Sequence, residues 1–346
     1  EEIIEKIIVE GEEVDKLEGV EEYVSLLFNK TPFYAEGGGQ VGDKGVIENS
    51  NFKLEVLNTI KRADKVFEHY GKLINGNIKT KDKVKLTVNK NNRNKITAHH
   101  SATHLLHSAL RRNLGNHVTQ KGSLVSESKL RFDISHNSAI CEELIFKIEK
   151  DINEQIFSNS SVTSSILNKS EAIKKGAMAI FGEKYGDEVR VIEMGTSNNN
   201  KAFSVELCGG THVKRTGDIG LIKIISETSL ASGVRRLEAV AGVLAIEEYR
   251  SIEHTLNNIS KSLKTNQKLV EEKILKLIVD KKEIEKEIKD IKSNKSDRVH
   301  KFDIKKINNI DVVSLVLKNI IAKELKSIVD EQLKKYQKAV IILVSD

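Results

Sequence analysis

The stretch AHHSATHLLHSALRRN, at Ala98–Asn113, combines a helix pattern with side chains that bind metals. Its apolar residues recur three and four positions apart, as on one face of a helix, and Gly115 lies just beyond its end. His100 and His104 are four positions apart, so a helix presents both imidazoles on one face. His107 falls on the same stripe, so this spacing alone leaves other ligand pairs open.

A second pair of ligand-type residues lies further along the chain. The segment CGGTH, at Cys208–His212, offers a thiolate and an imidazole around a Gly-Gly pair that suits a tight loop. Three imidazoles and one thiolate make a tetrahedral nitrogen and sulfur set, which favours one Zn²⁺ per chain. The predicted ligands are His100, His104, Cys208 and His212. Two alternatives stay open, a polar helix face without metal and a purely structural zinc.

The composition is that of a protein with ordinary packed cores. The chain has 346 residues, of which 39% are hydrophobic and 31% charged, and this length suits two or three domains. Cys141 and Cys208 provide no disulfide framework and suit a reducing cytosol, so we expect a cytoplasmic protein. No apolar run reaches the length of a membrane span, and we expect no membrane partner. The chain has no signal-peptide pattern, and because it starts at Glu1 without an initiator Met, we expect it to be a segment of a longer protein.

The net charge of +6 is unevenly distributed. Residues 247–346 contain 22 Lys and Arg against 17 Asp and Glu, an excess of five positive charges. This excess is compatible with a polyanionic partner, although a solvated helix surface is the more common cause of such an excess.

We predict an α+β fold with four parts. Residues 1–93 are expected to form a β-rich, barrel-like subdomain, because Phe52, Leu54 and Val56 alternate as in half-buried strands. The pair Asn75-Gly76 predicts a hairpin turn there. Residues 94–245 are expected to form a mixed α+β domain that carries the zinc site. Its predicted elements besides the first helix are strands near 122–125, 130–134, 189–194, 203–206, 219–225 and 234–240, and a helix near 142–158.

The third part, residues 246–300, contains neither Gly nor Pro. An apolar residue recurs at every seventh position from Leu256 to Ile291, which predicts a coiled coil or a long helical hairpin. Ser260, Gln267 and Lys281 interrupt this seam, and a single amphipathic helix packed on its own chain is the alternative. The fourth part, residues 301–346, is predicted to be a partial α/β domain. Its expected elements are a strand at 312–317, a helix at 322–336 and a strand at 339–344.

Six motifs occur in an order that resembles the editing region of bacterial alanyl-tRNA synthetases. They are TPFYAEGGGQ at Thr31–Gln40, the His100–His107 helix, QKGSLV at Gln120–Val125, AMAIFGEKYGDEVRV at Ala177–Val191, the Cys208–Val213 loop and GVRRLEAV at Gly233–Val240. The resemblance covers residues 1 to about 245, and the helical segment and C-terminal part resemble the linker and the start of the C-terminal domain of that enzyme.

The resemblance implies a function. Such a region hydrolyses the ester of mischarged Ser-tRNA(Ala) and Gly-tRNA(Ala) and spares Ala-tRNA(Ala), while the parent enzyme attaches alanine to tRNA(Ala) with ATP. The implied partners are the acceptor end of tRNA(Ala) and a second copy of the chain, paired through the C-terminal segment. A stand-alone alanyl-tRNA editing protein and a non-catalytic, zinc-stabilised module for tRNA binding and dimerisation are the alternatives. A metalloprotease is disfavoured, because HSATH has no Glu between its His residues to act as general base.

The resemblance also implies roles for individual residues. Thr103 and Gln120 are expected to line the catalytic pocket for the amino acid. For Thr103 the alternative is a hydroxyl that bonds its own helix backbone, and for Gln120 it is an ordinary loop position. Arg235 is expected to hold a phosphate, the terminal adenosine or a carboxylate, with a structural ion pair as the alternative.

Three further residues are expected to contact the nucleotide. Gly38 and Gly39 would let the backbone approach it closely, and Gln40 follows them. The alternative for this trio is a hairpin turn.

Overall fold

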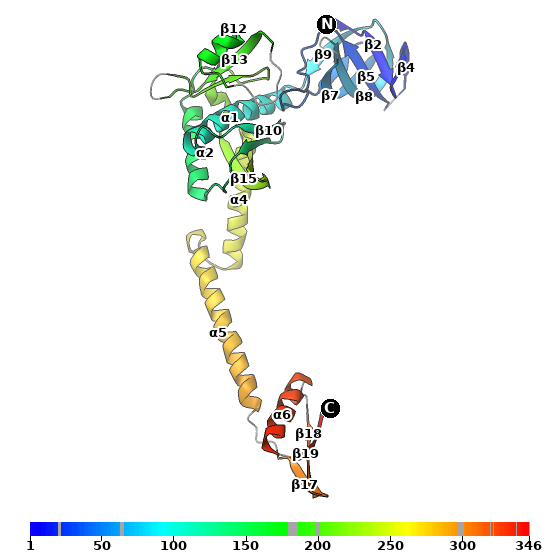
Figure 1. Cartoon of the computed structure of the whole chain (residues 1–346). Coiled ribbons are helices and arrows are strands. Elements are labelled where there is room, and N and C mark those ends of the chain that lie inside the picture. The colour runs from blue at the N-terminus through cyan, green and yellow to red at the C-terminus, as the bar shows by residue number, and fades with distance from the viewer. Residues whose placement is uncertain are drawn as a thin grey trace. The chain divides into compact units, whose positions relative to one another are not determined.

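The computed structural model describes residues 1–19, 22–62, 66–178, 186–197, 201–296, 301–318, 320, 322–336 and 338–345. The chain divides into two compact units, Glu1–Thr255 and Leu256–Asp346 (Figure 1). The first unit contains a large curled sheet, two smaller sheets and helices α1–α3, so the predicted mixed α+β class is confirmed.

The N-terminal part of the first unit is a nine-stranded sheet in the order β1-β9-β6-β7-β8-β5-β2-β3, with β4 paired to β8. Its strands are β1 (Glu2–Ile3), β2 (Lys6–Val9), β3 (Glu12–Val14), β4 (Lys16–Glu18), β5 (Tyr23–Phe28), β6 (Gly45–Glu48), β7 (Phe52–Arg62), β8 (Val66–Lys79) and β9 (Lys83–Val88). Phe52, Leu54 and Val56 of β7 are at most 2% exposed, so their alternation predicted the buried face correctly.

The predicted hairpin at Asn75-Gly76 is wrong. Both residues lie inside β8, where Asn75 pairs with Lys53 and Gly76 with Phe52 of β7. Gly76 has a φ of +89°, and a Cβ atom there would lie 1.9 Å from the carbonyl oxygen of Asn51. The glycine therefore serves a close approach of two backbones, and not a chain reversal.

The helix α1 (Lys90–Leu114) connects this sheet to the rest of the first unit. It begins eight residues before the predicted start, because Asn89 caps it by accepting a hydrogen bond from the Asn92 amide at 3.2 Å. At its other end the Gly115 amide donates to the Arg111 carbonyl at 2.9 Å, as predicted for a glycine just past a helix.

Two smaller sheets and two helices surround α1. One sheet has the order β10-β11-β16-β15 and the other the order β12-β13-β14. The elements are β10 (Gln120–Val125), β11 (Leu130–Ser135), α2 (Glu142–Phe157), β12 (Thr163–Asn168), α3 (Lys169–Lys174), β13 (Glu188–Met194), β14 (Ser204–Leu207), β15 (Ile222–Ala231) and β16 (Val234–Ala241). The strand predicted at 219–225 starts late, because Thr216–Ile219 forms a 3₁₀ turn that ends at Gly220, with φ +85°.

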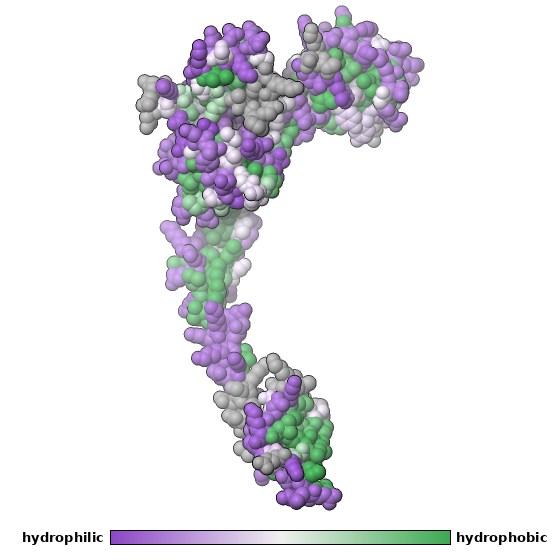
Figure 2. All heavy atoms as spheres, in the orientation of Figure 1, coloured by the Kyte–Doolittle hydropathy of each residue, from purple (hydrophilic) through white to green (hydrophobic). Residues whose placement is uncertain are grey.

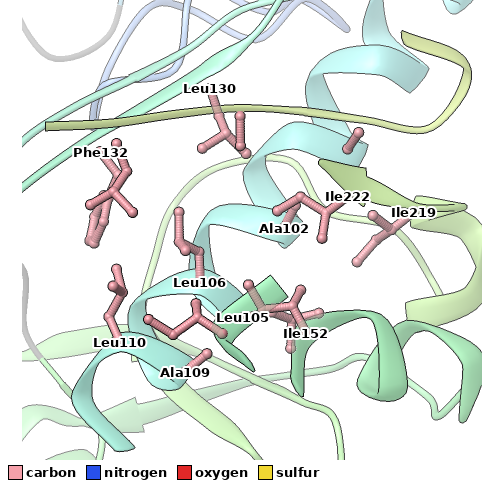
Figure 3. Packing of buried hydrophobic residues seen from close by; sticks show 14 of the residues in the cluster. Ala102, Leu105, Leu106, Ala109, Leu110, Leu130, Phe132, Ile152, Ile219 and Ile222 are labelled. Atoms are coloured by element: carbon pink, nitrogen blue, oxygen red, sulfur yellow. The ribbon is translucent and has the colours of Figure 1, made fainter. Parts of the chain in front are cut away.

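The core of this region is built on the apolar face of α1. Figure 3 shows the α1 side chains facing those of β11, α2 and β15. The labelled members are Ala102, Leu105, Leu106, Ala109, Leu110, Leu130, Phe132, Ile152, Ile219 and Ile222, each at most 1% exposed. Each large side chain among them stabilises the fold by about 1.5–3 kcal/mol through burial. This packing fixes the position of α1, and therefore also the position of the polar residues on its other face.

The second unit contains the helix α5 (Val270–Ser296), and α4 (Val243–Ser262) spans the division between the units. The residues of the heptad pattern form two helices and not one continuous helix, because α4 ends at Ser262 and α5 starts at Val270. Lys264 has a φ of +50° there, and Gln267–Leu269 forms a 3₁₀ turn. The seam residue Ile284 of α5 is 55% exposed, and Figure 2 shows other apolar residues on the surface of this helix. Coiled-coil pairing of this seam stays a prediction.

The C-terminal part is a small α/β unit. The sheet β17-β18-β19 consists of β17 (Asp303–Ile307), β18 (Ile310–Leu317) and β19 (Ala339–Ser345), with α6 (Ala322–Lys335) between its parallel strands. The predicted strand, helix and strand are confirmed, and β17 is an addition. Within the described ranges, no helix is both long and apolar enough to span a membrane.

Candidate metal centre and substrate site

The structure brings the four predicted zinc ligands together. One ligand atom from each of His100, His104, Cys208 and His212 lies within 4.8 Å of all the others. His100 and His104 project from one face of α1, and the loop after β14 supplies Cys208 and His212. The first three are at most 5% exposed, so the cluster is largely shielded from water.

The donor atoms fit a zinc ion. Cys208 Sγ lies 3.4 Å from His100 Nε2 and 3.3 Å from His212 Nε2. A tetrahedral zinc with usual bond lengths places sulfur and nitrogen ligands about 3.5 Å apart. His104 Nε2 is buried and has no hydrogen-bond partner among the described residues, as expected of an atom that awaits a metal.

Each imidazole is fixed through its other nitrogen. His100 Nδ1 lies 2.7 Å from Gln40 Oε1, and His212 Nδ1 lies 3.3 Å from Ser101 Oγ. His104 Nδ1 lies 2.7 Å from Glu206 Oε2. These acceptors favour the tautomer that leaves each Nε2 free to bind a cation.

The electrostatics of the cluster suit a cation as well. Burial alone lowers the pKa of His104, but the Glu206 carboxylate and the Cys208 thiolate outweigh it and raise the pKa to about 10. Burial raises the pKa of Cys208, and the neighbouring His100 and His104 bring it well below its usual range. Burial and the nearby His100 lower the pKa of His212 to about 3. The Cys208 thiolate and the neutral His212 imidazole are thus in the forms that bind metal, whereas a metal ion that binds His104 displaces a proton from it.

The loop between Cys208 and His212 requires one of its two glycines. A Cβ atom on Gly210 would lie 2.1 Å from His100 Cε1, whereas one on Gly209 meets nothing within 4 Å. Arg190 holds the loop by donating from Nη1 to the Gly210 carbonyl at 2.6 Å. Gly210 therefore permits the close approach of the loop to the helix.

Gln40 extends the site into the N-terminal sheet region. Its side chain is fully buried, and its Oε1 also accepts from the Thr211 amide at 3.0 Å. Its Nε2 donates to Thr211 Oγ1 at 2.9 Å. Both ends of the amide thus have partners within the protein, and nucleotide contact by Gln40 stays a prediction.

Gly38 and Gly39 form part of a tight turn, which is the alternative that the sequence left open. The backbone amides and carbonyls of Gly37 and Gln40 bond each other at 3.0 and 3.1 Å, and the two residues between them have positive φ. A Cβ atom on Gly39 would lie 2.7 Å from the Ser123 carbonyl oxygen of β10. The close approach observed here is to the protein's own backbone.

Thr103 lies within α1, 5% exposed, and its hydroxyl donates to the His99 carbonyl at 2.8 Å. The hydroxyl thus bonds its own helix backbone, which is the alternative role for Thr103, and its oxygen is still able to accept a hydrogen bond. Gln120 is half-buried at the start of β10, opposite Ile134. Gln120 therefore sits on a strand, and not in a loop.

Arg235 of β16 forms a two-pronged ion pair with Glu227 of β15, with Nη2 and Oε2 2.6 Å apart. The adjacent Arg236 pairs with Asp133 at 2.7 and 2.9 Å. The structural ion pair that was the alternative for Arg235 is thus present. A contact of Arg235 with phosphate stays a prediction. For that contact, the Arg235 guanidinium would have to bind the phosphate and Glu227 at the same time.

The sequence did not single out Glu206 or Ser101, although both touch ligand histidines. A weak signal for Glu206 was available, since an acidic residue sits in the apolar strand that leads to Cys208. Ser101 lies between the helix ligands and carried no such signal. Residues 179–185 of the AMAIFGEKYGDEVRV motif lie outside the described residues.

Two regions of the chain match known protein families, and the chain has curated relatives. Residues 1–92 match the family model for class II (A) tRNA synthetases, and residues 189–238 match that for the second additional domain of threonyl and alanyl tRNA synthetases. An alanine–tRNA ligase from Mesorhizobium japonicum is 44% identical over 290 residues, which are 83% of this chain and 32% of that protein. The chain thus spans about a third of the length of this relative. From these matches, the chain belongs to the bacterial alanyl-tRNA synthetase family.

Proposed function

We propose that residues 94–245 form an editing site that hydrolyses the ester of Ser-tRNA(Ala) and Gly-tRNA(Ala). The observation that carries this proposal is the buried cluster of three imidazoles and one thiolate. Two of its members, Cys208 and His212, lie within the region similar to the second additional domain of threonyl and alanyl tRNA synthetases. We assign the four residues as ligands of one zinc ion per chain.

A bound zinc ion supplies a positive charge that polarises or anchors a substrate oxygen. Because four protein ligands would fill the usual coordination of zinc, we do not assign activation of water to the ion; we favour a role in positioning the substrate, with water oriented by nearby polar groups. The chain's own residues then do the remaining work. The rigid α1 helix and the Gly210 turn fix the donors, and burial of the cluster keeps bulk water away from it.

Thr103 is our candidate for recognition of serine. Its hydroxyl proton is engaged by the His99 carbonyl, so its oxygen is left as an acceptor. The hydroxyl of a seryl group is a matching donor, whereas an alanyl group leaves the acceptor unpaired. Gln120 is the second candidate for the amino-acid pocket, and removal of glycine rests on the family resemblance alone.

The remaining proposals concern the protein as a whole. The parent enzyme attaches alanine to tRNA(Ala) with ATP. The acceptor end of this tRNA is the partner of the chain. Residues 1–93 are the barrel-like subdomain, residues 246–300 a helical linker, and residues 301–346 the start of a C-terminal domain for tRNA binding and dimerisation. The exposed seam of α5 supports a role in association.

The test is hydrolysis of Ser-tRNA(Ala) and Ala-tRNA(Ala) by the purified chain under single-turnover conditions. We expect serine to be released much faster than alanine, and the activity to fall after chelation and return with added zinc. Equal rates on both esters would contradict a serine-selective pocket. Full zinc content without any deacylation would favour the non-catalytic tRNA-binding module.

A further inference from the structure

Glu206 is a buried carboxylate that binds two imidazoles of α1 at once. The residue is 2% exposed and lies in β14, two positions before Cys208. Its Oε2 lies 2.7 Å from His104 Nδ1, and its Oε1 lies 3.2 Å from His107 Nδ1. The Ser204 hydroxyl adds a third hydrogen bond at 3.0 Å to Oε1.

We propose that Glu206 is the positioning residue of His104 in the metal centre, with His107 as its support. This inference rests on the proposed zinc site. A carboxylate oxygen only accepts, so the contact requires the proton of His104 to be on Nδ1. The lone pair of Nε2 is then directed into the cluster, where the atom is buried and otherwise without a described partner. Glu206 thus selects both the tautomer and the ring orientation that a metal needs.

Charge balance gives a second reason for a carboxylate at this position. A divalent cation with one thiolate and three neutral imidazoles carries a net charge of +1 in a buried site. Such a charge is costly away from water unless a counter-ion lies close. Glu206 supplies one negative charge directly behind a ligand, and its three donors satisfy the carboxylate.

His107 shares the helix face of the ligands but has a different task. Its Nδ1 faces Glu206, and its ring packs against Phe132 at a centroid distance of 5.3 Å. It is not a member of the cluster of four donor atoms. We therefore assign His107 to holding the carboxylate in place, and not to binding the metal.

The experiment measures zinc affinity of the whole chain by competition with a chromophoric chelator. Glu206→Gln keeps the size of the side chain but replaces one acceptor oxygen with a donor, so the two imidazoles can no longer both donate to it. We expect zinc binding to weaken by roughly 10- to 100-fold, as for other groups that orient metal ligands. His107→Phe leaves the contact between Glu206 and His104 intact, so its loss should be smaller than that of Glu206→Gln.

Glu149→Gln is the matched control. Glu149 is 7% exposed in α2 and accepts from the Ile224 amide at 2.8 Å and from Lys223. This variant removes a buried carboxylate of the same unit, and we expect it to lower the melting temperature without weakening zinc binding. Equal zinc affinity of wild type and a folded Glu206→Gln protein would overturn the proposal. So would a loss for His107→Phe as large as that for His104→Ala, because His107 would then be a ligand.

Deacylation of Ser-tRNA(Ala) is measured in parallel, which separates this inference from the proposed function. Weakened zinc binding in Glu206→Gln supports the positioning role even if the wild type releases no serine, in which case the editing proposal alone fails. If Glu206→Gln binds zinc as tightly as the wild type and the wild type releases serine, the positioning role is wrong and the editing proposal stands.

Discussion

Gln40 Oε1 lies 2.7 Å from His100 Nδ1, and this hydrogen bond joins two segments that are far apart in the sequence. Gln40 follows the glycine turn that docks on β10, where the Val125 amide donates to the Gly39 carbonyl at 2.7 Å. His100 belongs to α1. The N-terminal sheet region thus takes part in fixing a residue that we assign as a metal ligand, and both segments belong to the first unit.

The Gln40 contact predicts that the turn and the metal centre are coupled. Gln40→Leu removes the acceptor for His100 and leaves the Thr211 amide without its partner. We expect the free energy of unfolding to fall by about 1–3 kcal/mol, because a buried donor is left unsatisfied, and zinc binding to weaken. Urea unfolding and chelator competition measure the two effects. Gln155→Leu, which removes a contact to the Thr196 amide, is the control and should leave zinc affinity unchanged.

The zinc assignment predicts one equivalent of metal per chain. Cys208→Ala should retain less zinc than wild type in elemental analysis, because it removes the thiolate of the cluster. Cys141→Ala is the matched control, since Cys141 is exposed and lies outside the cluster. Full zinc occupancy in the double variant His100→Ala, His104→Ala would show that the ligands are other residues.

The two glycines of the Cys208–His212 loop make a sharper test of its geometry. Gly210→Ala places a Cβ atom 2.1 Å from His100 Cε1, so either the loop or the imidazole must move. We expect zinc affinity to fall by at least tenfold, in line with other disturbances of metal-ligand orientation. Gly209→Ala meets nothing within 4 Å and should bind zinc as the wild type does. Equal affinities of the two variants would mean that His100 does not occupy this position in the metal-bound protein.

A buried histidine of the N-terminal sheet predicts a pH dependence of stability. Burial lowers the pKa of His69 to about 4, and its Nε2 lies 2.8 Å from Thr31 Oγ1. Because the folded pKa lies below the unfolded value of 6.5, the unfolded chain takes up the proton first as the pH falls. The stabilising contribution of neutral His69 is therefore complete above pH 6.5 and is lost towards pH 4, by about 3 kcal/mol in total.

Urea unfolding between pH 7 and pH 4 measures this effect as a difference between proteins. His69→Gln should show a shallower loss of stability over this range than the wild type. Parallel curves for wild type and His69→Gln would mean that His69 is not buried in neutral form.

The sequence predicted the candidate ligands as pairs where the members of a pair lie close together in the chain. The spacing of His100 and His104 on one helix, and of Cys208 and His212 around a turn, follows from short segments, and the structure brings these pairs together. Glu206 was missed because its role depends on the approach of β14 to α1, which the local sequence does not encode.

Local signals also failed where tertiary contacts compete with them. The Asn75-Gly76 pair favours a turn in isolation, but its pairing with β7 keeps it inside a strand. The break after α4 carries no Gly or Pro, and Lys264 adopts a positive φ that sequence patterns rarely reveal. Ser260 and Gln267 interrupt the apolar seam close to this break, but their polarity alone does not reveal that a helix ends there.

The last prediction concerns how alanine is spared. Thr103→Val keeps the branched shape of the side chain and removes the oxygen that we propose as acceptor for the serine hydroxyl. The loss of one neutral hydrogen bond costs about 0.5–1.5 kcal/mol, which corresponds to a roughly 2- to 13-fold slower hydrolysis of Ser-tRNA(Ala). Ala-tRNA(Ala) has no hydroxyl to lose, so its rate should stay the same and the ratio of the two rates should fall.

Thr103→Ser is the matched control, because it keeps the oxygen and its bond to the His99 carbonyl. It should preserve the ratio of serine to alanine release within a factor of about two, since the hydrogen bond remains. If Thr103 acts only through its helix, Thr103→Val should instead slow both reactions together and lower the melting temperature. An unchanged ratio in a well-folded Thr103→Val protein would remove Thr103 from the pocket and leave Gln120 as the residue to test next.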